Sequence, residues 1–321
     1  SANCHCYHHR LSGYLQSISR AAQQLPEFTS LLPGLELPSR VNCAAEILDK
    51  NIERGLGDKT AIDPVSTAKW SYRDLFEASN RIAHVLINEF SLVPGNRVLL
   101  RAGNSPMLVA CWFAVLKAGG IAVTTMPMMR SKDLVPIIEK AQISLAICEH
   151  SLSRELEDAQ SLCHSLQTIA MFGHGAGQST HRTIESCMVE QPAEFECVHT
   201  SADDVAIIAF TSGTTGNPKG TMHFHRHVLA MATCFSEQVL KPTSNDLFIG
   251  SPPLAFTFGL GALVVFPMCA GATTVLPQKP GPNHLAEAIE QTGATICFSS
   301  PTGYRGMLNC INDHSVSYTH L

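Results

Sequence analysis

The sequence is poor in charge and has no cluster of charge of either sign. Only 15% of its 321 residues are charged, and the formal net charge is −5. Lysines and arginines are scattered singly, so the sequence predicts no basic patch that would attract nucleic acid or an anionic lipid surface. Hydrophobic residues make up 45% of the chain, which is typical of folded proteins. We therefore predict a globular protein with neither a nucleic-acid partner nor a membrane partner.

The spacing of the cysteines predicts neither a disulfide framework nor a cysteine-based metal site. The twelve cysteines are irregularly spaced and form no C-x-x-C pair, whereas small secreted scaffolds are far denser in cysteine. We interpret them as reduced, mostly buried thiols of a cytoplasmic protein. Cys4 and Cys6 lie beside His5, His8 and His9, but zinc-type spacing is absent, so we predict no metal site.

One long uncharged stretch raises the question of a membrane span. Residues 250–278 contain no charged side chain, and a stretch of that length would be long enough to cross a bilayer. Prolines and glycines divide it into pieces that are too short to cross. These are Pro252, Pro253, Gly259, Gly261, Pro267 and Gly271. We therefore predict a buried helix and strand in this stretch.

Strands and helices are expected to alternate along most of the chain. The predicted strands are residues 96–100, 121–123, 145–148, 205–210, 247–249, 273–276 and 296–298, and the predicted helices are residues 105–117, 131–141, 225–238, 258–268 and 284–291. Such alternation is typical of parallel sheets covered by helices on both faces. We predict an α/β fold of two stacked α/β subdomains, residues 41–198 and 199–314, which follow an N-terminal extension of residues 1–40.

A loop rich in glycine and hydroxyl groups follows the strand predicted at residues 205–210. Residues 211–220 read Thr-Ser-Gly-Thr-Thr-Gly-Asn-Pro-Lys-Gly. Glycines let backbone N–H groups approach an anion, hydroxyls donate hydrogen bonds to phosphate oxygens, and a lysine supplies positive charge. Lys219 follows a proline instead of a glycine, so this is not a Walker P-loop; a polar turn is the alternative. We predict that nucleotide phosphates are bound by Thr211, Ser212, Gly213, Thr214, Thr215, Gly216 and Lys219.

Three alternating histidines follow this loop. On a helix, His223, His225 and His227 would be spread around the axis, so we predict no metal site there. We expect His225 to brace the loop.

Two phenylalanines flank a threonine and precede a glycine after the strand predicted at residues 247–249. Residues 251–261 read Ser-Pro-Pro-Leu-Ala-Phe-Thr-Phe-Gly-Leu-Gly. Phe256 and Phe258 would sandwich a planar ring, and Gly259 would leave room for the ring beside the backbone. Thr257 would hydrogen-bond a ring substituent or a carboxylate. The alternative is that both phenylalanines are ordinary core residues.

The loop at residues 211–220 resembles the phosphate-binding signature of the adenylate-forming superfamily, which includes acyl-CoA synthetases, luciferases and peptide-synthetase adenylation domains. Residues 116–123, Leu-Lys-Ala-Gly-Gly-Ile-Ala-Val, are similar to its first, structural core motif. Many members carry histidine where Phe256 stands, whereas aryl-acid ligases of the benzoate and 2-aminobenzoate type carry an aromatic residue. Further segments similar to 2-aminobenzoate–CoA ligases are residues 42–46, 93–101, 222–226 and 301–308.

The resemblance implies an AMP-forming acid–thiol ligase that uses ATP, Mg²⁺ and coenzyme A. An aromatic acid of the 2-aminobenzoate or benzoate type would first form an acyl-adenylate and then a CoA thioester. Lys219 would act as a catalytic residue by stabilising charge on the leaving pyrophosphate, together with loop amides and Mg²⁺. Two alternatives stay open, namely a ligase for arylpropenoic or fatty acids and a non-catalytic nucleotide-binding protein.

Later motifs of the superfamily do not occur in these 321 residues. They are a Tyr-Gly-x-Thr-Glu segment, an acidic residue for the ribose, and a C-terminal domain that carries a lysine. Residues 315–321 resemble translated sequencing adapter more than any family sequence. We therefore expect the C-terminal domain to be absent, residues 315–321 to be an artefactual tail, and this chain to be nearly or completely inactive.

Overall fold

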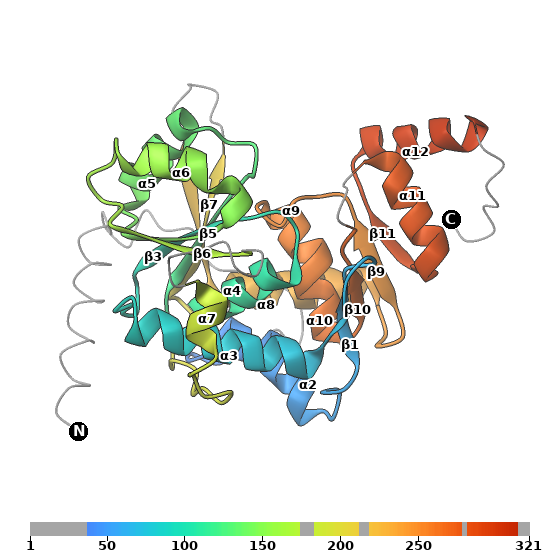
Figure 1. Ribbon diagram of the computed structural model, residues 1–321. Helices are drawn as coiled ribbons and strands as arrows, with labels where there is room; N and C mark the ends of the chain where they lie inside the picture. Colours follow the sequence, from blue (N-terminus) through green and yellow to red (C-terminus); the bar gives the residue numbers. More distant parts are fainter. Residues whose placement is uncertain (1–36, 174–182, 212–217, 278–280, 314–321) are drawn as a thin grey trace, which may run out of the picture. The chain divides into compact units, whose positions relative to one another are not determined.

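The computed structural model describes residues 37–173, 183–211, 218–277 and 281–313 (Figure 1). These residues belong to one compact unit and contain two β-sheets with helices packed against them. This is the predicted α/β fold, which is thereby confirmed.

The six-stranded sheet is parallel except at one edge. Its strand order is β6-β5-β3-β4-β7-β8, and only the last pair, β7 and β8, is antiparallel. The strands are β3 (Arg97–Arg101), β4 (Ile121–Thr125), β5 (Leu145–Glu149), β6 (Thr168–Phe172), β7 (Val205–Thr211) and β8 (Lys219–Phe224). Strands β3, β4, β5 and β7 were predicted and β6 was not, whereas β8 corrects the expectation of an all-parallel sheet.

Helices cover both faces of this sheet. Successive side chains of a strand point to opposite faces, and those of the central strands are buried on both. Val98 and Leu100 of β3 pack in the hydrophobic cluster that includes the long helices α3 and α4, while Leu99 packs in the cluster with α5 and α6. The helices are α3 (Tyr72–Asn88), α4 (Pro106–Lys117), η3 (His150–Leu152), α5 (Ser131–Ala141), α6 (Ser153–Gln160) and α7 (Ile184–Met188).

The five-stranded sheet has the order β11-β9-β10-β1-β2, in which only β2 is antiparallel to its neighbour. Its strands are β1 (Thr60–Asp63), β2 (Trp70–Ser71), β9 (Leu247–Gly250), β10 (Thr273–Val275) and β11 (Ile296–Phe298). The remaining helical segments are η2 (Ala45–Asp49), α2 (Lys50–Glu53), α8 (His225–Met231), η4 (Ala232–Leu240), α9 (Thr257–Leu260), η5 (Gly261–Val265), α10 (Phe266–Ala270), α11 (Pro282–Thr292) and α12 (Pro301–Asp313).

Within the uncharged stretch, residues 259–276 are almost all buried and form core, as predicted, whereas Phe256, Thr257 and Phe258 are exposed. Every residue of η5 is buried, and so is every residue of β10. The helix expected at residues 258–268 is divided into α9, η5 and α10. Within the described residues, no helix is both long enough and apolar enough to span a membrane.

The boundary expected near residue 199 does not coincide with the division between the sheets. Strands β7 and β8 follow this position but join the six-stranded sheet, whereas β1 and β2 precede it but join the five-stranded sheet. The two stacked subdomains stay a proposal. Each would contain one of the two sheets, and neither would be a single continuous stretch of sequence.

A buried lysine joins three helical segments beneath the six-stranded sheet. Lys117, at the end of α4, has no exposed side-chain surface, and its Nζ lies 2.6 Å from Oδ1 of Asp49 in η2. The same Nζ donates to Oδ1 of Asn80 at 2.7 Å and lies 4.4 Å from the ring centroid of Phe76, both in α3. Burial lowers the pKa of Lys117 and raises the pKa of Asp49, while the attraction between the two charges opposes both shifts.

Ten of the twelve cysteines lie in the described residues, and the structure describes the side chains of nine of them. None of these nine forms a disulfide, and Cys234 is the one among them that is exposed. Cys4, Cys6 and the neighbouring histidines lie outside the described residues.

Candidate functional site

The carboxyl ends of strands from both sheets meet at one loop. Asn104 follows β3, and its Nδ2 donates to the carbonyl oxygen of Pro252 at 3.1 Å while its Oδ1 accepts from the backbone N–H of Leu254 at 2.9 Å. Thr124 in β4 donates from Oγ1 to the carbonyl oxygen of Ala255 at 3.0 Å. The three bonded residues belong to the segment after β9, residues 251–259, which we call the aromatic loop. Because α/β sheets bind ligands at the carboxyl ends of their strands, this junction is the candidate site.

Both phenylalanines of the aromatic loop are exposed. The exposed fraction is 44% for Phe256 and 51% for Phe258, so the alternative that they are ordinary core residues is wrong. The Phe258 ring meets the ring of Phe298 in β11 edge-on, with 6.1 Å between the centroids. Thr257 lies between them as the first residue of α9 and is exposed as well. The three predicted acid-binding side chains therefore share one accessible segment.

Gly259 is required by the protein's own backbone. A Cβ atom at this position would lie 2.1 Å from the carbonyl oxygen of Pro253 and 2.9 Å from that of Pro252. No side chain fits at that distance, so the fold of the loop requires glycine at this position. The sequence did not reveal this requirement. The predicted contact between Gly259 and a ring stays a prediction.

Thr211 and Lys219 form the base of a β-hairpin. Thr211 ends β7 and pairs with Lys219, the first residue of β8, and both are exposed. Strands β4 and β7 are parallel, with Ala122 opposite Ile207, so Thr211 extends past the carboxyl end of β4. The predicted phosphate loop thus leaves the same edge of the sheet at which Thr124 holds the aromatic loop.

The central part of the predicted phosphate loop is Ser212, Gly213, Thr214, Thr215 and Gly216. These residues lie outside the described residues, so their role as phosphate ligands stays a prediction.

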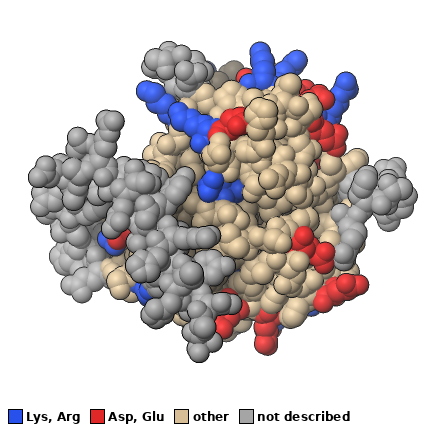
Figure 2. All heavy atoms as spheres, turned by 90° about the vertical axis from the view of Figure 1, so that its left-hand side faces the viewer, with Lys and Arg blue, Asp and Glu red and all other residues tan. Residues whose placement is uncertain are grey.

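Helix α5 places one lysine beside the hairpin. Nζ of Lys140 donates to the carbonyl oxygen of Pro218 at 3.0 Å, and Lys132 lies exposed on the same helix. On the face shown in Figure 2, Lys and Arg side chains lie mostly in the upper half, whereas Asp and Glu side chains lie in both halves. The ammonium group of Lys140 next to the loop favours the approach of an anion such as a phosphate.

His225 does not brace the phosphate loop. It is buried at the start of α8, and its Nδ1 accepts a hydrogen bond from the backbone N–H of Cys43 at 3.1 Å. The side chain thus connects α8 to the segment that leads into η2, and the expectation from sequence is corrected. Burial lowers the pKa of His225 to about 4.

This buried histidine predicts a loss of stability in weak acid. The folded pKa of about 4 lies below the ordinary value of 6.5, so the unfolded chain binds more protons between these two values. The free energy of unfolding therefore falls as the pH drops from about 6.5 to about 4, by about 2 kcal/mol between about pH 7 and pH 5. His225→Asn keeps an acceptor near the Nδ1 position but does not titrate, and it should lack this part of the loss in urea unfolding. The exposed His164→Asn is the control and should follow the wild type; an unchanged pH dependence in His225→Asn would contradict the prediction.

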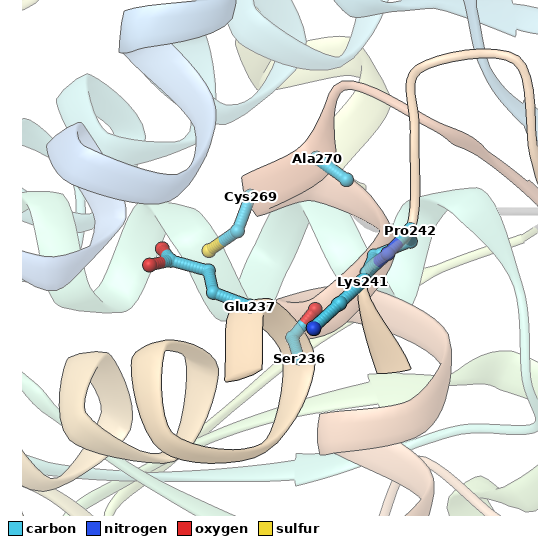
Figure 3. A pocket seen from close by; sticks show the side chains of 6 residues that line it. All are labelled: Ser236, Glu237, Lys241, Pro242, Cys269 and Ala270. Atoms are coloured by element: carbon cyan, nitrogen blue, oxygen red, sulfur yellow. The ribbon is translucent and has the colours of Figure 1, made fainter. Parts of the chain in front are cut away.

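A separate cavity of about 350 Å³ lies between the ends of η4 and α10 (Figure 3). It is lined by Ser236, Glu237, Lys241, Pro242, Cys269 and Ala270. These residues come just before β9 and β10, whereas the aromatic loop follows β9, so the cavity is not part of the candidate site. Burial raises the pKa of Cys269 to about 12, which leaves its thiol protonated and a poor nucleophile.

The sequence matches known proteins over most of its length. A family model described as AMP-binding enzyme matches residues 48–320. The benzoate–CoA ligase of Thauera aromatica is 26% identical over 278 residues, which is 86% of this chain and 52% of that protein. The anthranilate–CoA ligase of Pseudomonas aeruginosa is 28% identical over 220 residues, which is 67% of this chain and 41% of that protein. The chain thus spans about half the length of the curated relatives it matches.

Solved structures share the fold. The crystal structure of the anthranilate CoA ligase AuaEII in complex with anthranoyl-AMP superposes with a TM-score of 0.79 at 26% identity, covering 85% of this chain and 52% of that one. A long-chain-fatty-acid–CoA ligase (FadD1) from Archaeoglobus fulgidus reaches the same TM-score of 0.79 at 22% identity, covering 91% of this chain and 58% of that one. With a family match that covers residues 48–320 and a fold shared with these ligases, the chain belongs to the AMP-binding enzyme family, the adenylate-forming superfamily.

Proposed function

We propose that this chain is the part of an AMP-forming aryl acid–CoA ligase that binds the aromatic acid and the phosphates of ATP. One observation carries the proposal: the loop with the exposed Phe256 and Phe258 is hydrogen-bonded to β4, the neighbour of the strand that leads into the phosphate loop. A ring held at the aromatic loop would place its carboxylate toward nucleotide phosphates at the same edge of the sheet. Adenylation needs this proximity, because the two reactants must be held in line.

The proposed step is an attack by a carboxylate oxygen on the α-phosphorus of ATP. The bond between the α-phosphorus and the oxygen that bridges to the β-phosphate breaks, and pyrophosphate leaves with that oxygen. Lys219 and the loop amides stabilise the charge that develops on the leaving group. Phe256 and Phe258 hold the ring, and Thr257 donates a hydrogen bond to the carboxylate or to a ring substituent. Positioning and electrostatics account for this step, so no cysteine is assigned to it.

Mg²⁺ fits this chemistry as part of the Mg·ATP substrate. Among the residues that the structure describes, no three histidine, cysteine or acidic side chains form a metal-binding group. Mg²⁺ is commonly held by substrate phosphates with few protein ligands, and the exposed hydroxyl of Thr211 is available at the base of the hairpin. The thiolate of coenzyme A would then attack the acyl carbon, the bond to the phosphate of AMP would break, and AMP would leave. That this chain forms no aroyl-CoA by itself stays a prediction.

Two variants, one in the aromatic loop and one in the phosphate loop, test the two halves of the site separately. Phe256→Ala/Phe258→Ala should weaken binding of 2-aminobenzoate roughly tenfold, since each aromatic contact contributes about 0.5–1.5 kcal/mol, and should leave Mg·ATP binding unchanged. Lys219→Ala should weaken Mg·ATP binding roughly tenfold, since a hydrogen bond to a charged group contributes about 1.5–3 kcal/mol, and should leave acid binding unchanged. Fluorescence titration with 2-aminobenzoate and calorimetry with Mg·ATP measure the two affinities.

Matched controls come from elsewhere in the chain. Leu162 is 64% exposed and Lys241 is exposed beside the separate cavity, so Leu162→Ala and Lys241→Ala should bind both ligands like the wild type. A wild-type chain that binds no aromatic acid would contradict the proposal. Hexanoate that displaces 2-aminobenzoate with equal affinity would contradict the aryl preference and favour a fatty-acid ligase.

A further inference from the structure

Asn104 connects the two sheets through the backbone of the aromatic loop. Its side-chain amide donates to the carbonyl oxygen of Pro252 and accepts from the N–H of Leu254, two residues further along. An amide that uses both its donor and its acceptor on one backbone segment holds that segment at two points. The contact therefore fixes both the distance and the orientation of the loop relative to β3.

Thr124 adds a third bond one residue before the first phenylalanine. Its Oγ1 donates to the carbonyl oxygen of Ala255, and the next residue is Phe256. We call Asn104 and Thr124 together the loop clamp. Both are partly buried, which shields their hydrogen bonds from competing water.

The other side of the loop is fixed by its own backbone. The carbonyl oxygen of Pro253 accepts from the N–H of Phe256 at 3.1 Å and packs directly against Gly259. The carbonyl oxygen of Phe256 accepts in turn from the N–H of Leu260 at 2.9 Å. With the clamp on one side and α9 on the other, the backbone that carries both phenylalanines has little freedom to shift.

We infer that Asn104 and Thr124 are positioning residues for the substrate acid. This inference rests on the proposed function, because it assigns the clamp to the same aromatic loop. Neither residue needs to touch the ring; each acts through the backbone that directs Phe256 and Phe258. Aromatic contacts depend on ring placement, and a displacement of about 1 Å is enough to impair in-line attack. Loss of the clamp should thus weaken acid binding and leave nucleotide binding intact.

Four variants test the clamp by their affinity for 2-aminobenzoate and for Mg·ATP. Asn104→Ala removes two bonds and should weaken 2-aminobenzoate binding roughly tenfold. Thr124→Val replaces only the hydroxyl and should weaken 2-aminobenzoate binding roughly fivefold. Thr124→Ser keeps the hydroxyl and should bind 2-aminobenzoate with wild-type affinity. Asn88→Ala, which removes an exposed side-chain amide from α3, is the control and should change nothing. Mg·ATP affinity should be unchanged in all four variants.

Hydrogen exchange at the amide of Leu254 gives a readout that needs no ligand. This N–H donates to Oδ1 of Asn104, so Asn104→Ala should speed its exchange and Thr124→Ser should not. If the wild type binds 2-aminobenzoate but Asn104→Ala and Thr124→Val bind it equally well, the inference is overturned and the proposed function stands. Equal losses of acid and Mg·ATP affinity would show a general structural role and overturn it too. If the wild type binds no aromatic acid, the proposed function fails and the positioning role fails with it.

Discussion

Replacing Lys117 by methionine is expected to lower the free energy of unfolding by about 3–5 kcal/mol. The change removes the ammonium from a buried site where it contacts Asp49, Asn80 and Phe76. The carboxylate of Asp49 then loses its cation in a poorly solvated place, and removing one partner of a buried ion pair is more costly than removing both. Urea unfolding followed by circular dichroism measures the difference.

The neighbouring Lys50 supplies the matched control. It forms an ion pair with Glu46 across one helical turn, but 44% of its side chain is exposed. Lys50→Met should therefore change stability by no more than about 0.5 kcal/mol. The double variant Asp49→Leu/Lys117→Met, which removes both charges, should recover part of the loss. Equal effects of Lys117→Met and Lys50→Met would show that the buried pair has no special role.

Adding one methyl group at Gly259 is expected to cost about 3 kcal/mol of folding stability. The new Cβ would lie 2.1 Å from the carbonyl oxygen of Pro253, so the backbone of the aromatic loop must move. This movement also carries Phe256 and Phe258 away from their positions, so 2-aminobenzoate binding should be lost at concentrations that saturate the wild type. Thermal unfolding and the fluorescence titration measure the two effects.

Gly281→Ala is the control for this substitution. At that position the nearest side-chain atom would be 3.6 Å from the new Cβ, which is ordinary contact. The backbone of Gly281 has a φ of −70°, so alanine is expected to fit, and the cost of about 1 kcal/mol or less comes from alanine being a poorer N-cap than glycine. Wild-type stability together with wild-type acid binding in Gly259→Ala would refute the proposed close contact.

Local sequence patterns predicted most of the strands with buried side chains but missed β1 and β6. Apolar runs marked β3, β5, β7 and β9, because a parallel strand covered on both faces contains little else. The same criterion failed for β8, whose first four residues are exposed and include Lys219. An exposed edge strand carries no hydrophobic pattern, so it was not distinguished from the loop before it.

Helix α3 was missed although its start carries a recognisable signal. Ser71 and Asp74 form a capping box in which each side chain accepts a hydrogen bond from the other residue's backbone N–H. Serine three positions before an acidic residue is the sequence signature of this motif. That signal would have placed the helix start at residue 72.

The candidate site was predictable only where its residues are contiguous. The aromatic loop and the base of the phosphate hairpin were found because several functional side chains occur within ten residues. Asn104 and Thr124 were not found, because their partners Pro252 and Ala255 lie 148 and 131 positions away in the sequence. A single polar residue at the end of a strand does not reveal which distant backbone it will bind.

The exchange of strands between the two halves of the chain has a consequence for the order of folding. Strands β3, β4, β5 and β6 lie within residues 97–172 and can pair soon after synthesis. Strand β1 has only β2 beside it until β10 is made, because Ile62 of β1 lies opposite Thr274 of β10 (Figure 1). Closing so long a loop is slow, and an unpaired strand edge is prone to intermolecular association in the meantime. During translation, therefore, one edge of β1 stays open until Val275 has been made.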